Sequence, residues 1–359
     1  MKILHVITSL HTGGAETLLV NIIPRLTALG HKVDIAVFNG AYTPLMERLE
    51  KESPECKIYK LGHSYYNPLY IVRLIGIMRK YDIVHTHNSS PQLFAAIANI
   101  ICRRRLVTTE HNTNNRKRNN RFLTVIDKWM YTRYSKIICI SDQAEENLKE
   151  YLDNNEDKRN ICTIYNGIDT AKFHQAIPLK EYHSTRFVIA MVAAFRPQKD
   201  QDTLVRMMKL LPNESYELWL VGDGERRDLI EKEVKRQRLQ NVIKFWGLRT
   251  DIPQILKTAD VVVMSTHYEG LSLSNIEGMA VGKPFVASDV EGIHEVTDGY
   301  GILFPHEDAE ALAKIIQHLH DDKKYYQEIA DRCYERAKQF DISKMVKAYN
   351  NVYHSVITE

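Results

Sequence analysis

Residues 259–277 read ADVVVMSTHYEGLSLSNIE, and this stretch decides the fold prediction. Its first part is an apolar, β-branched run, which is typical of a buried strand. A small polar loop follows, and the next residues, NIEGMAVGKP, indicate a helix that ends at Gly282 before Pro284. A strand that leads through a loop into a helix is the repeating step of a parallel α/β sheet. Glu269 and Glu277 flank the loop, so the stretch is also a candidate binding site.

The same alternation runs along the whole chain. Strands are predicted at 2–8, 32–38, 82–87, 105–111 and 136–141, and then at 186–195, 217–224, 242–247, 260–266, 283–289 and 301–305. This pattern predicts an α/β protein of two doubly wound, Rossmann-like parallel-sheet domains with a cleft between them. The domains are expected at 1–170 and 186–340, with a linker over 166–186 and a last helix at about 341–359.

Length and composition limit the function classes. The 359 residues suit two domains, and 44% hydrophobic with 26% charged residues is a globular composition. A net charge of +3 is too small to indicate nucleic-acid binding. The 5 cysteines are scattered without a C-x-x-C pair, which argues against disulfides and zinc. The start MKILHVITSL reads as a strand rather than a signal peptide, and no apolar run reaches membrane-span length. We therefore expect a cytoplasmic protein.

Parallel α/β sheets bind ligands at the carboxyl ends of their strands. In the opening stretch, free amides at the helix start can hold phosphate groups. Glu277, about one turn into the helix, suits a diol such as ribose hydroxyls, and Glu269 can accept hydrogen bonds from a sugar. A capped helix with surface glutamates remains an alternative. A glycosidase pair is disfavoured because eight helical residues span about 12 Å, whereas retaining glycosidases need about 5 Å.

Two other strand-end loops carry candidate phosphate ligands. In HTGGAE, at 11–16, Gly13 and Gly14 allow a diphosphate to approach the backbone, although a plain tight turn stays open. A nicotinamide site would need G-x-G-x-x-G and an acidic residue after the second strand, and neither occurs. In FRPQKD, at 195–200, Arg196 and Lys199 can neutralise a diphosphate. The DQD at 200–202 resembles a metal motif but is better explained by helix capping.

Histidines follow two predicted strands. His111 comes after the fourth predicted strand and can offer a hydrogen bond to a sugar hydroxyl or a carbonyl. His85 and His87 share one side of a strand, but no third metal ligand is evident, so structural histidines are favoured over a metal site. The segment 103–121 brackets His111 with seven basic residues and one acidic residue. It can attract anionic lipid or phosphate, or be a solvated face, and it lacks the interleaved aromatics of single-strand binders.

Several motifs together resemble one enzyme family. They are GGAE, EHN, PQKD, GDGE and the long run EGLSLSNIEGMAVGKPFVASDVEGIHEV at 269–296. This set is similar to that of the retaining glycosyltransferases of family 4, which have the GT-B fold, and NGID at 166–169 looks like the interdomain linker of that family. One departure is Ala194, where the family usually has an arginine, and Arg196 is the expected replacement.

The resemblance implies a role for each candidate residue. Glu277 would hold the nucleotide ribose, Glu269 the donor sugar, and Arg249 would border the base. Lys199 and Gly14 would contact the diphosphate, and His111 would lie by the reacting sugar. The last helix would pack back on the N-terminal domain. The loop amides that would contact sugar and diphosphate are those of Gly270, Leu271, Ser272, Leu273 and Ser274. Acceptor-binding or membrane-facing positions are Glu16, Arg116, Lys117 and Arg118.

The implied reaction is retaining transfer of a hexose or N-acetylhexosamine from a nucleotide-diphosphate sugar, with UDP favoured over GDP. The acceptor would be a glycan or a polyprenyl-diphosphate-linked glycan in surface polysaccharide synthesis. Neither a metal nor a cofactor is expected, and no nucleic-acid partner. The basic segment 103–121 would place the protein on the inner face of the cytoplasmic membrane. Two alternatives remain, namely a nucleotide-sugar 2-epimerase of the same shape and a non-catalytic partner of another transferase.

Overall fold

The computed structural model describes residues 1–11, 13–111, 121–152, 160–182, 184–269 and 272–358. The chain divides into two compact units, which are described separately. Unit 1 comprises Met1–Gly167 with Ile342–Glu359, and unit 2 comprises Ile168–Asp341. Each unit is a parallel sheet with helices, so the predicted fold class is confirmed.

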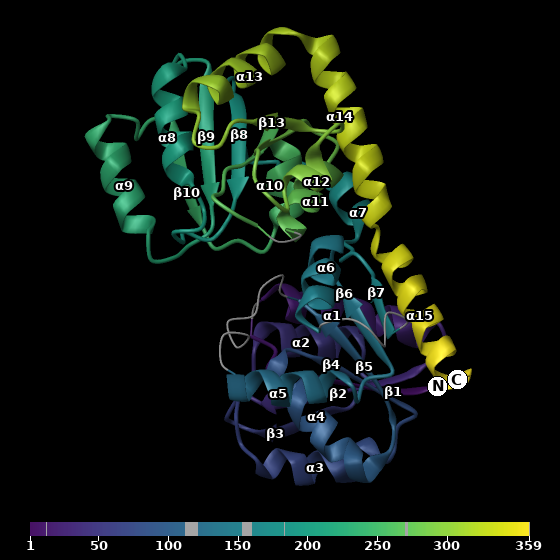
Figure 1. Cartoon of the computed structure of the whole chain (residues 1–359). Coiled ribbons are helices and arrows are strands. Elements are labelled where there is room, and N and C mark those ends of the chain that lie inside the picture. Colours follow the sequence, from purple (N-terminus) through teal and green to yellow (C-terminus); the bar gives the residue numbers. More distant parts are fainter. Residues whose placement is uncertain (12, 112–120, 153–159, 183, 270–271, 359) are drawn as a thin grey trace. The chain divides into compact units, whose positions relative to one another are not determined.

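Unit 1 contains a seven-stranded parallel sheet in the order β3-β2-β1-β4-β5-β6-β7 (Figure 1). Its central strands β1 and β4 are buried throughout except at Lys2, as a sheet covered on both faces requires. The strands are β1 (Lys2–Ile7), β2 (Lys32–Asn39), β3 (Ile58–Gly62), β4 (Ile83–His87), β5 (Arg105–Glu110), β6 (Lys136–Cys139) and β7 (Ile161–Thr163).

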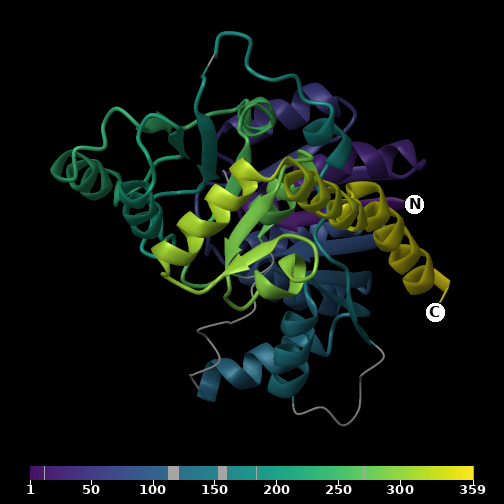
Figure 2. The ribbon, with the colours of Figure 1, turned by 90° about the horizontal axis from the view of Figure 1, so that it is seen from above.

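The helices of unit 1 cover two separate apolar cores, one on each face of the sheet. The C-terminal helix, yellow in Figures 1 and 2, belongs to this unit and buries Tyr349 and Tyr353 in the same core as the first helix. The helices are α1 (Gly14–Ala28), α2 (Pro44–Glu52), α3 (Leu69–Met78), α4 (Ser89–Cys102), α5 (Arg121–Tyr131), α6 (Asp142–Tyr151) and α15 (Ile342–Thr358).

Unit 2 contains a six-stranded parallel sheet in the order β10-β9-β8-β11-β12-β13. The strands are β8 (Phe187–Val192), β9 (Tyr216–Val221), β10 (Ile243–Gly247), β11 (Val261–Met264), β12 (Phe285–Ser288) and β13 (Ile302–Phe304). The helices are α7 (Thr170–His174), α8 (Gln201–Leu210), α9 (Arg227–Arg236), α10 (Ile252–Thr258), α11 (Leu273–Ala280), α12 (His294–Thr297), α13 (Ala309–Asp321), α14 (Lys323–Ala337) and the short 3-10 helix η3 (Lys338–Phe340).

The structure differs from the sequence prediction at three places. The prediction missed β3, an edge strand with mostly half-exposed residues, and β7, which has only three residues. Neither shows the long apolar run of a central strand. Because β3 adds a strand, His111 follows the fifth strand rather than the fourth. The segment 166–186, predicted as a linker, contains α7, whose Phe173 packs in the core of unit 2.

Within the described ranges, no helix is both long and apolar enough to cross a membrane.

Gly222 follows β9 at a position where the backbone of unit 2 has no room for a side chain. Its φ is +138°, and a Cβ there would overlap the carbonyl oxygen of Ala193. We expect Gly222→Ala to lower the free energy of unfolding by about 1–3 kcal/mol. The control is Gly76→Ala in α3, where a Cβ would meet open space. This change should raise the free energy of unfolding by about 0.5–1 kcal/mol. Urea unfolding measures the free energy of unfolding of both variants. If Gly222→Ala is as stable as the wild type, a Cβ at position 222 causes no strain and the prediction is wrong.

Candidate functional site

The loops that follow β8 and β11 lie side by side because these strands are neighbours in the sheet of unit 2. Lys199 and Thr266 form an antiparallel backbone bridge. The backbone amide of His267 donates to the carbonyl oxygen of Gln198 at 2.9 Å. The side-chain Nε2 of Gln198 donates to the carbonyl oxygen of Tyr268 at 2.8 Å. The two predicted ligand loops are therefore fastened into one surface.

Lys199 and Glu269, both predicted to bind the donor, form an ion pair on this surface. Their side chains are 14% and 9% exposed, so the pair is largely removed from water. The hydroxyl of Thr266 donates to the same oxygen of Glu269 at 3.1 Å. The carboxylate holds the ammonium group in place, and an anionic ligand would compete with it for Lys199. Sequence reasoning missed Thr266 because its role depends on the contact between the loops.

The start of α11 is the second part of the site. Ser272 is its N-cap residue, and Leu273 and Ser274 begin the helix. Glu277 is half-buried and has no hydrogen-bond or ion-pair partner in the part of the chain that the structure describes. Removal from water raises the pKa of Glu277 to about 7, and Lys172 lowers it. An unpaired carboxylate of this kind can accept hydrogen bonds from vicinal hydroxyls. Gly270 and Leu271 lie outside the described residues.

A pocket of about 270 Å³ opens at the carboxyl ends of β8, β9 and β10. The predicted residues Arg249 and Ser274 line it, and so does Ala194. The guanidinium of Arg249 is held by the carboxylate of Asp251 at 2.8 and 2.5 Å. The sequence motifs predict the loops but not the other lining residues, which are Val192, Ala193, Val221, Gly222, Asp223, Leu248 and Ile252.

Arg196, the expected replacement for the missing arginine, is exposed. Its amide donates to the carbonyl oxygen of Ala194 at 3.0 Å. Among the described residues its side chain joins neither Lys199 nor Glu269 by a hydrogen bond or ion pair. The nearby Asp200 accepts from the amide of Thr203 as the N-cap of α8, so the predicted capping role is confirmed.

Gly14 is the first residue of α1, and a Cβ there would meet open space, so the backbone is accessible. The carboxylate of Glu16 lies over Gly13. Burial raises the pKa of Glu16, whereas its own backbone amide and His11 lower it. The carboxylate of Glu16 therefore lies at Gly13, whereas the backbone of Gly14 stays open.

Unit 1 gathers four histidines at its sheet. The parallel register pairs His5 of β1 with His85 of β4, so His5 is the neighbour that sequence reasoning missed. His5 and His87 share a hydrogen bond of 3.0 Å, and His87 and His111 share another of 3.0 Å. His85 bonds the hydroxyls of Tyr353 at 2.7 Å and Thr109 at 2.8 Å.

Burial keeps these four imidazoles neutral. It lowers the pKa of His5 to about 3 and that of His111 to about 4. Burial, followed by the neighbouring histidines, lowers the pKa of His85 and His87 well below the usual value. His5, His85 and His87 could converge on a metal ion, but both nitrogens of His85 are already engaged by hydroxyls. That no metal takes part stays a prediction.

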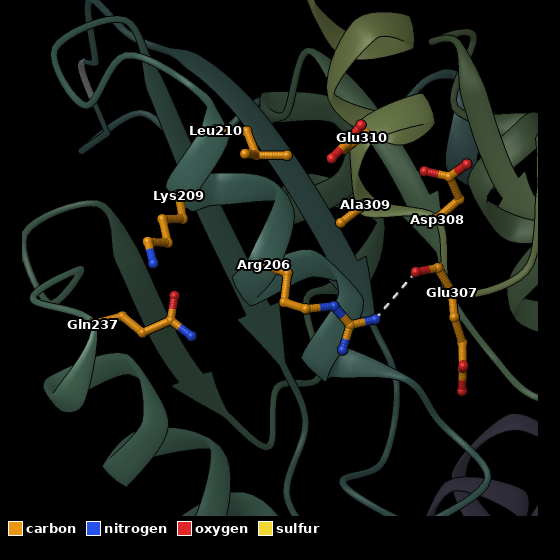
Figure 3. Close-up of a pocket in the computed structure, with 8 residues that line it drawn as sticks. All are labelled: Arg206, Lys209, Leu210, Gln237, Glu307, Asp308, Ala309 and Glu310. Carbon is orange, nitrogen blue, oxygen red and sulfur yellow. Dashed lines mark hydrogen bonds between the residues drawn. The ribbon is translucent and has the colours of Figure 1, made fainter.

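Two other features of unit 2 contain none of the predicted residues. A pocket of about 510 Å³ has Arg206 and Glu307 on its wall, where Arg206 donates to the carbonyl oxygen of Glu307 at 3.2 Å (Figure 3). Its lining mixes both charge signs and contains none of the predicted site residues. His267 and His306 share a hydrogen bond of 2.9 Å beside Glu307 on the surface.

The basic segment 103–121 is described only in part. Arg103 and Arg105 are exposed, and Arg104 donates to the carbonyl oxygen of Arg79 at 2.6 Å. Arg116, Lys117 and Arg118 lie outside the described residues.

Known proteins are similar to this chain along nearly its whole length. A sequence profile described as "Glycosyl transferases group 1" matches residues 174–340, and one described as "Glycosyltransferase Family 4" matches residues 12–172. The chain is similar to the UDP-Gal:alpha-D-GlcNAc-diphosphoundecaprenol alpha-1,3-galactosyltransferase of Escherichia coli, at 30% identity over 271 residues that cover 68% of this chain and 67% of that protein.

Two further similarities cover nearly the whole chain. N-acetyl-alpha-D-glucosaminyl L-malate synthase of Bacillus anthracis is 24% identical over 370 residues, 97% of this chain and 95% of that protein. The crystal structure of Anabaena HepE in complex with UDP has a TM-score of 0.85 at 23% identity, covering 99% of this chain and 100% of that chain. This likeness shows the GT-B fold.

Because its buried histidines have lowered pKa values, we expect the protein to lose stability in mild acid. Their folded pKa values lie below the ordinary value, so unfolded histidines take up protons first as the pH falls below about 6.5. Each fully buried imidazole then costs about 1.4 kcal/mol per pH unit. In urea unfolding, the stability difference between wild type and His5→Gln should stay flat above pH 7. Below pH 6 the difference in the free energy of unfolding should shift in favour of the variant by about 1.4 kcal/mol per pH unit. A difference that stays constant below pH 6 would contradict a neutral His5.

Proposed function

The chain belongs to the family 4 glycosyltransferases, and from this premise we propose that it transfers a hexose or N-acetylhexosamine from UDP to a lipid-linked glycan with retention of configuration. The proposed product is part of a surface polysaccharide. The observation that carries the donor assignment is the pocket at the ends of β8 to β10, which Ser274 of α11 lines. On the same helix, Glu277 carries a carboxylate with no partner among the described residues.

The relatives supply the donor and acceptor classes. HepE of Anabaena has been crystallised with UDP and with UDP-glucose. The E. coli relative is named for a UDP-galactose donor and a diphosphoundecaprenol acceptor. A Rhizobium meliloti relative, 31% identical over 165 residues, is named for lipopolysaccharide core biosynthesis. These names support UDP and a polyprenyl-diphosphate acceptor for this chain.

We assign the donor contacts residue by residue. The base enters the 270 Å³ pocket beside the backbone of Arg249, and Glu277 accepts from the ribose hydroxyls. The diphosphate takes over Lys199 from its ion pair with Glu269, which frees that carboxylate for the donor sugar. Amides at Ser272, Leu273 and Ser274 face the same anion, and Gly14 and Arg196 are further proposed contacts.

The reaction then needs charge stabilisation on the leaving group. The acceptor hydroxyl oxygen bonds to the anomeric carbon as the bond to the diphosphate oxygen breaks. Both events occur on one face of the sugar, so the configuration is retained, and the leaving phosphate oxygen takes the hydroxyl proton. Lys199 and the start of α11 stabilise the developing negative charge, so we expect no metal requirement. His111 is assigned a hydrogen bond to the reacting sugar.

The acceptor side is proposed to meet an anionic membrane through unit 1. Helices α3 and α4 pack together, and α5 contacts α4. All three helices expose large apolar side chains, and exposed cations such as Arg73 and Arg103 accompany them. The apolar residues are Leu69, Val72, Ile100, Ile101, Val125 and Ile126, each 47–70% exposed. Apolar side chains among cations suit an anionic lipid surface. Glu16, Arg116, Lys117 and Arg118 remain proposed acceptor-binding residues.

A thermal-shift panel of UDP, GDP and their sugars tests the donor assignment. Saturating UDP should raise the Tm of the wild type, because a ligand that binds only the native state stabilises it. Glu277→Ala should raise the donor KM by about 10- to 100-fold, as expected for lost hydrogen bonds to a charged group. The control is Glu328→Ala, an exposed glutamate of α14, which should behave as the wild type. An unchanged Tm with every nucleotide, or wild-type KM in Glu277→Ala, would refute the assignment.

Co-sedimentation with phosphatidylglycerol vesicles tests the membrane contact. Val72→Glu places a negative charge among the exposed apolar residues of α3 and should reduce the bound fraction several-fold. Leu229→Glu makes the same change at a 55% exposed leucine of α9 in unit 2 and should have no effect. Equal binding by both variants, or no preference for anionic over neutral vesicles, would exclude this docking face.

A further inference from the structure

We propose that His5 and His87 are positioning residues for His111, and that the chain of three imidazoles holds His111 in the single tautomer whose proton is on Nδ1. The half-buried end of the chain then presents a fixed N–H donor. This inference rests on the proposed function in one respect, namely that His111 contacts the reacting sugar.

The three rings form a continuous hydrogen-bonded line. Nε2 of His111 lies 3.0 Å from Nδ1 of His87, and Nε2 of His87 lies 3.0 Å from Nδ1 of His5. His87 therefore uses both ring nitrogens within the chain. A neutral imidazole has one donor nitrogen and one acceptor nitrogen, so His87 must donate to one neighbour and accept from the other. The tautomers of the three rings are consequently linked, and fixing one of them fixes the other two.

The interior allows only the neutral form of the chain. His5 and His87 are at most 1% exposed, and their pKa values lie far below neutrality because of burial. At neutral pH the chain can therefore adopt only two arrangements, which differ in the direction of every hydrogen bond.

The inner end of the chain selects between these arrangements. Nε2 of His5 is buried and has no partner among the described residues. In one arrangement this nitrogen carries a proton and is an orphaned donor. In the other it carries only a lone pair. Among backbone groups, orphaned N–H donors are rarer in protein interiors than under-satisfied carbonyl acceptors, and we apply the same preference to this imidazole nitrogen. We therefore assign protons to Nδ1 of His5, Nδ1 of His87 and Nδ1 of His111.

The surrounding residues hold the rings in place. His85 stacks on His87 with ring centroids 4.4 Å apart, and hydroxyls of Tyr353 and Thr109 bind both nitrogens of His85. Tyr353 comes from α15, so the C-terminal helix fixes the ring that supports the chain. Because β1, β4 and β5 are adjacent, the sheet register itself sets the spacing of the three imidazoles.

The fixed tautomer matters for the reaction because it decides whether His111 presents a donor or an acceptor to the sugar. Nδ1–H of His111 can donate to a sugar oxygen without first choosing a tautomer. If His5 loses its polar atom, the ring of His87 loses the hydrogen bond that keeps its Nδ1 aimed at Nε2 of His111. The tautomer of His111 is then no longer fixed by His87. His111 would then present a lone pair instead of a proton for part of the time. The donor would still bind, so kcat should fall while the donor KM stays unchanged.

Long-range 15N–1H NMR of histidine-labelled protein tests the tautomer without any substrate. We expect the His111 signal, identified by its loss in His111→Ala, to show a proton on Nδ1 only. His5→Leu should give a mixture of both tautomers. His5→Asn retains a side-chain donor near the position of Nδ1 and should restore the single form. A wild-type His111 that is mixed, or protonated on Nε2, overturns the proposal whether or not the variants fold.

Kinetics then test the positioning role. His5→Leu should lower kcat by about fivefold, which corresponds to one hydrogen bond, and His5→Asn should recover most of it. In a His111→Ala background the same His5→Leu change should have no further effect on kcat. An unchanged kcat in His5→Leu, with a reduced kcat in His111→Ala, overturns the positioning role alone. An unchanged kcat in His111→Ala refutes the proposed function of His111 and the kinetic claim with it.

Discussion

The parallel pairing of β1 with β4, and of β8 with β11, is the constraint on which both candidate site clusters depend. In each sheet this pair is the place where the strand order reverses direction. Loops that leave two such strands run to opposite sides of the sheet and expose backbone groups between them, so ligands collect there. In unit 2 the pair places Lys199 beside Glu269. In unit 1 it places His5 beside His85.

The two clusters handle charge in different ways. In unit 2, opposite charges are present in advance, since Lys199 is paired with Glu269 while Glu277 has no partner among the described residues. A diphosphate sugar can rearrange these groups without bringing a counter-ion. In unit 1, burial removes charge altogether, and the histidines interact through neutral hydrogen bonds. A preorganised site of this kind needs little reorganisation when charge develops in a transition state.

Local pattern was informative where burial is uniform along an element. The central strands and the start of α11 could be predicted because continuous apolar runs and a loop with small residues leave few alternatives. The edge strand β3 and the three-residue β7 were not predicted. Most of their residues are only partly buried, so neither strand shows the apolar pattern of a central strand. The segment 166–186 read as a linker because α7 has only five residues, yet Phe173 anchors it in the core.

The sequence by itself determined the class of fold, the strand-end loops and the residue types able to hold a sugar nucleotide. Tertiary structure alone decided which of these residues meet. The pairing of Lys199 with Glu269 spans 70 positions, and the bond from His5 to His87 spans 82. Such contacts follow from strand order and register, which are set by packing over the whole sheet. No local spacing rule encodes them, and for that reason Thr266 and His5 became visible only in the folded chain.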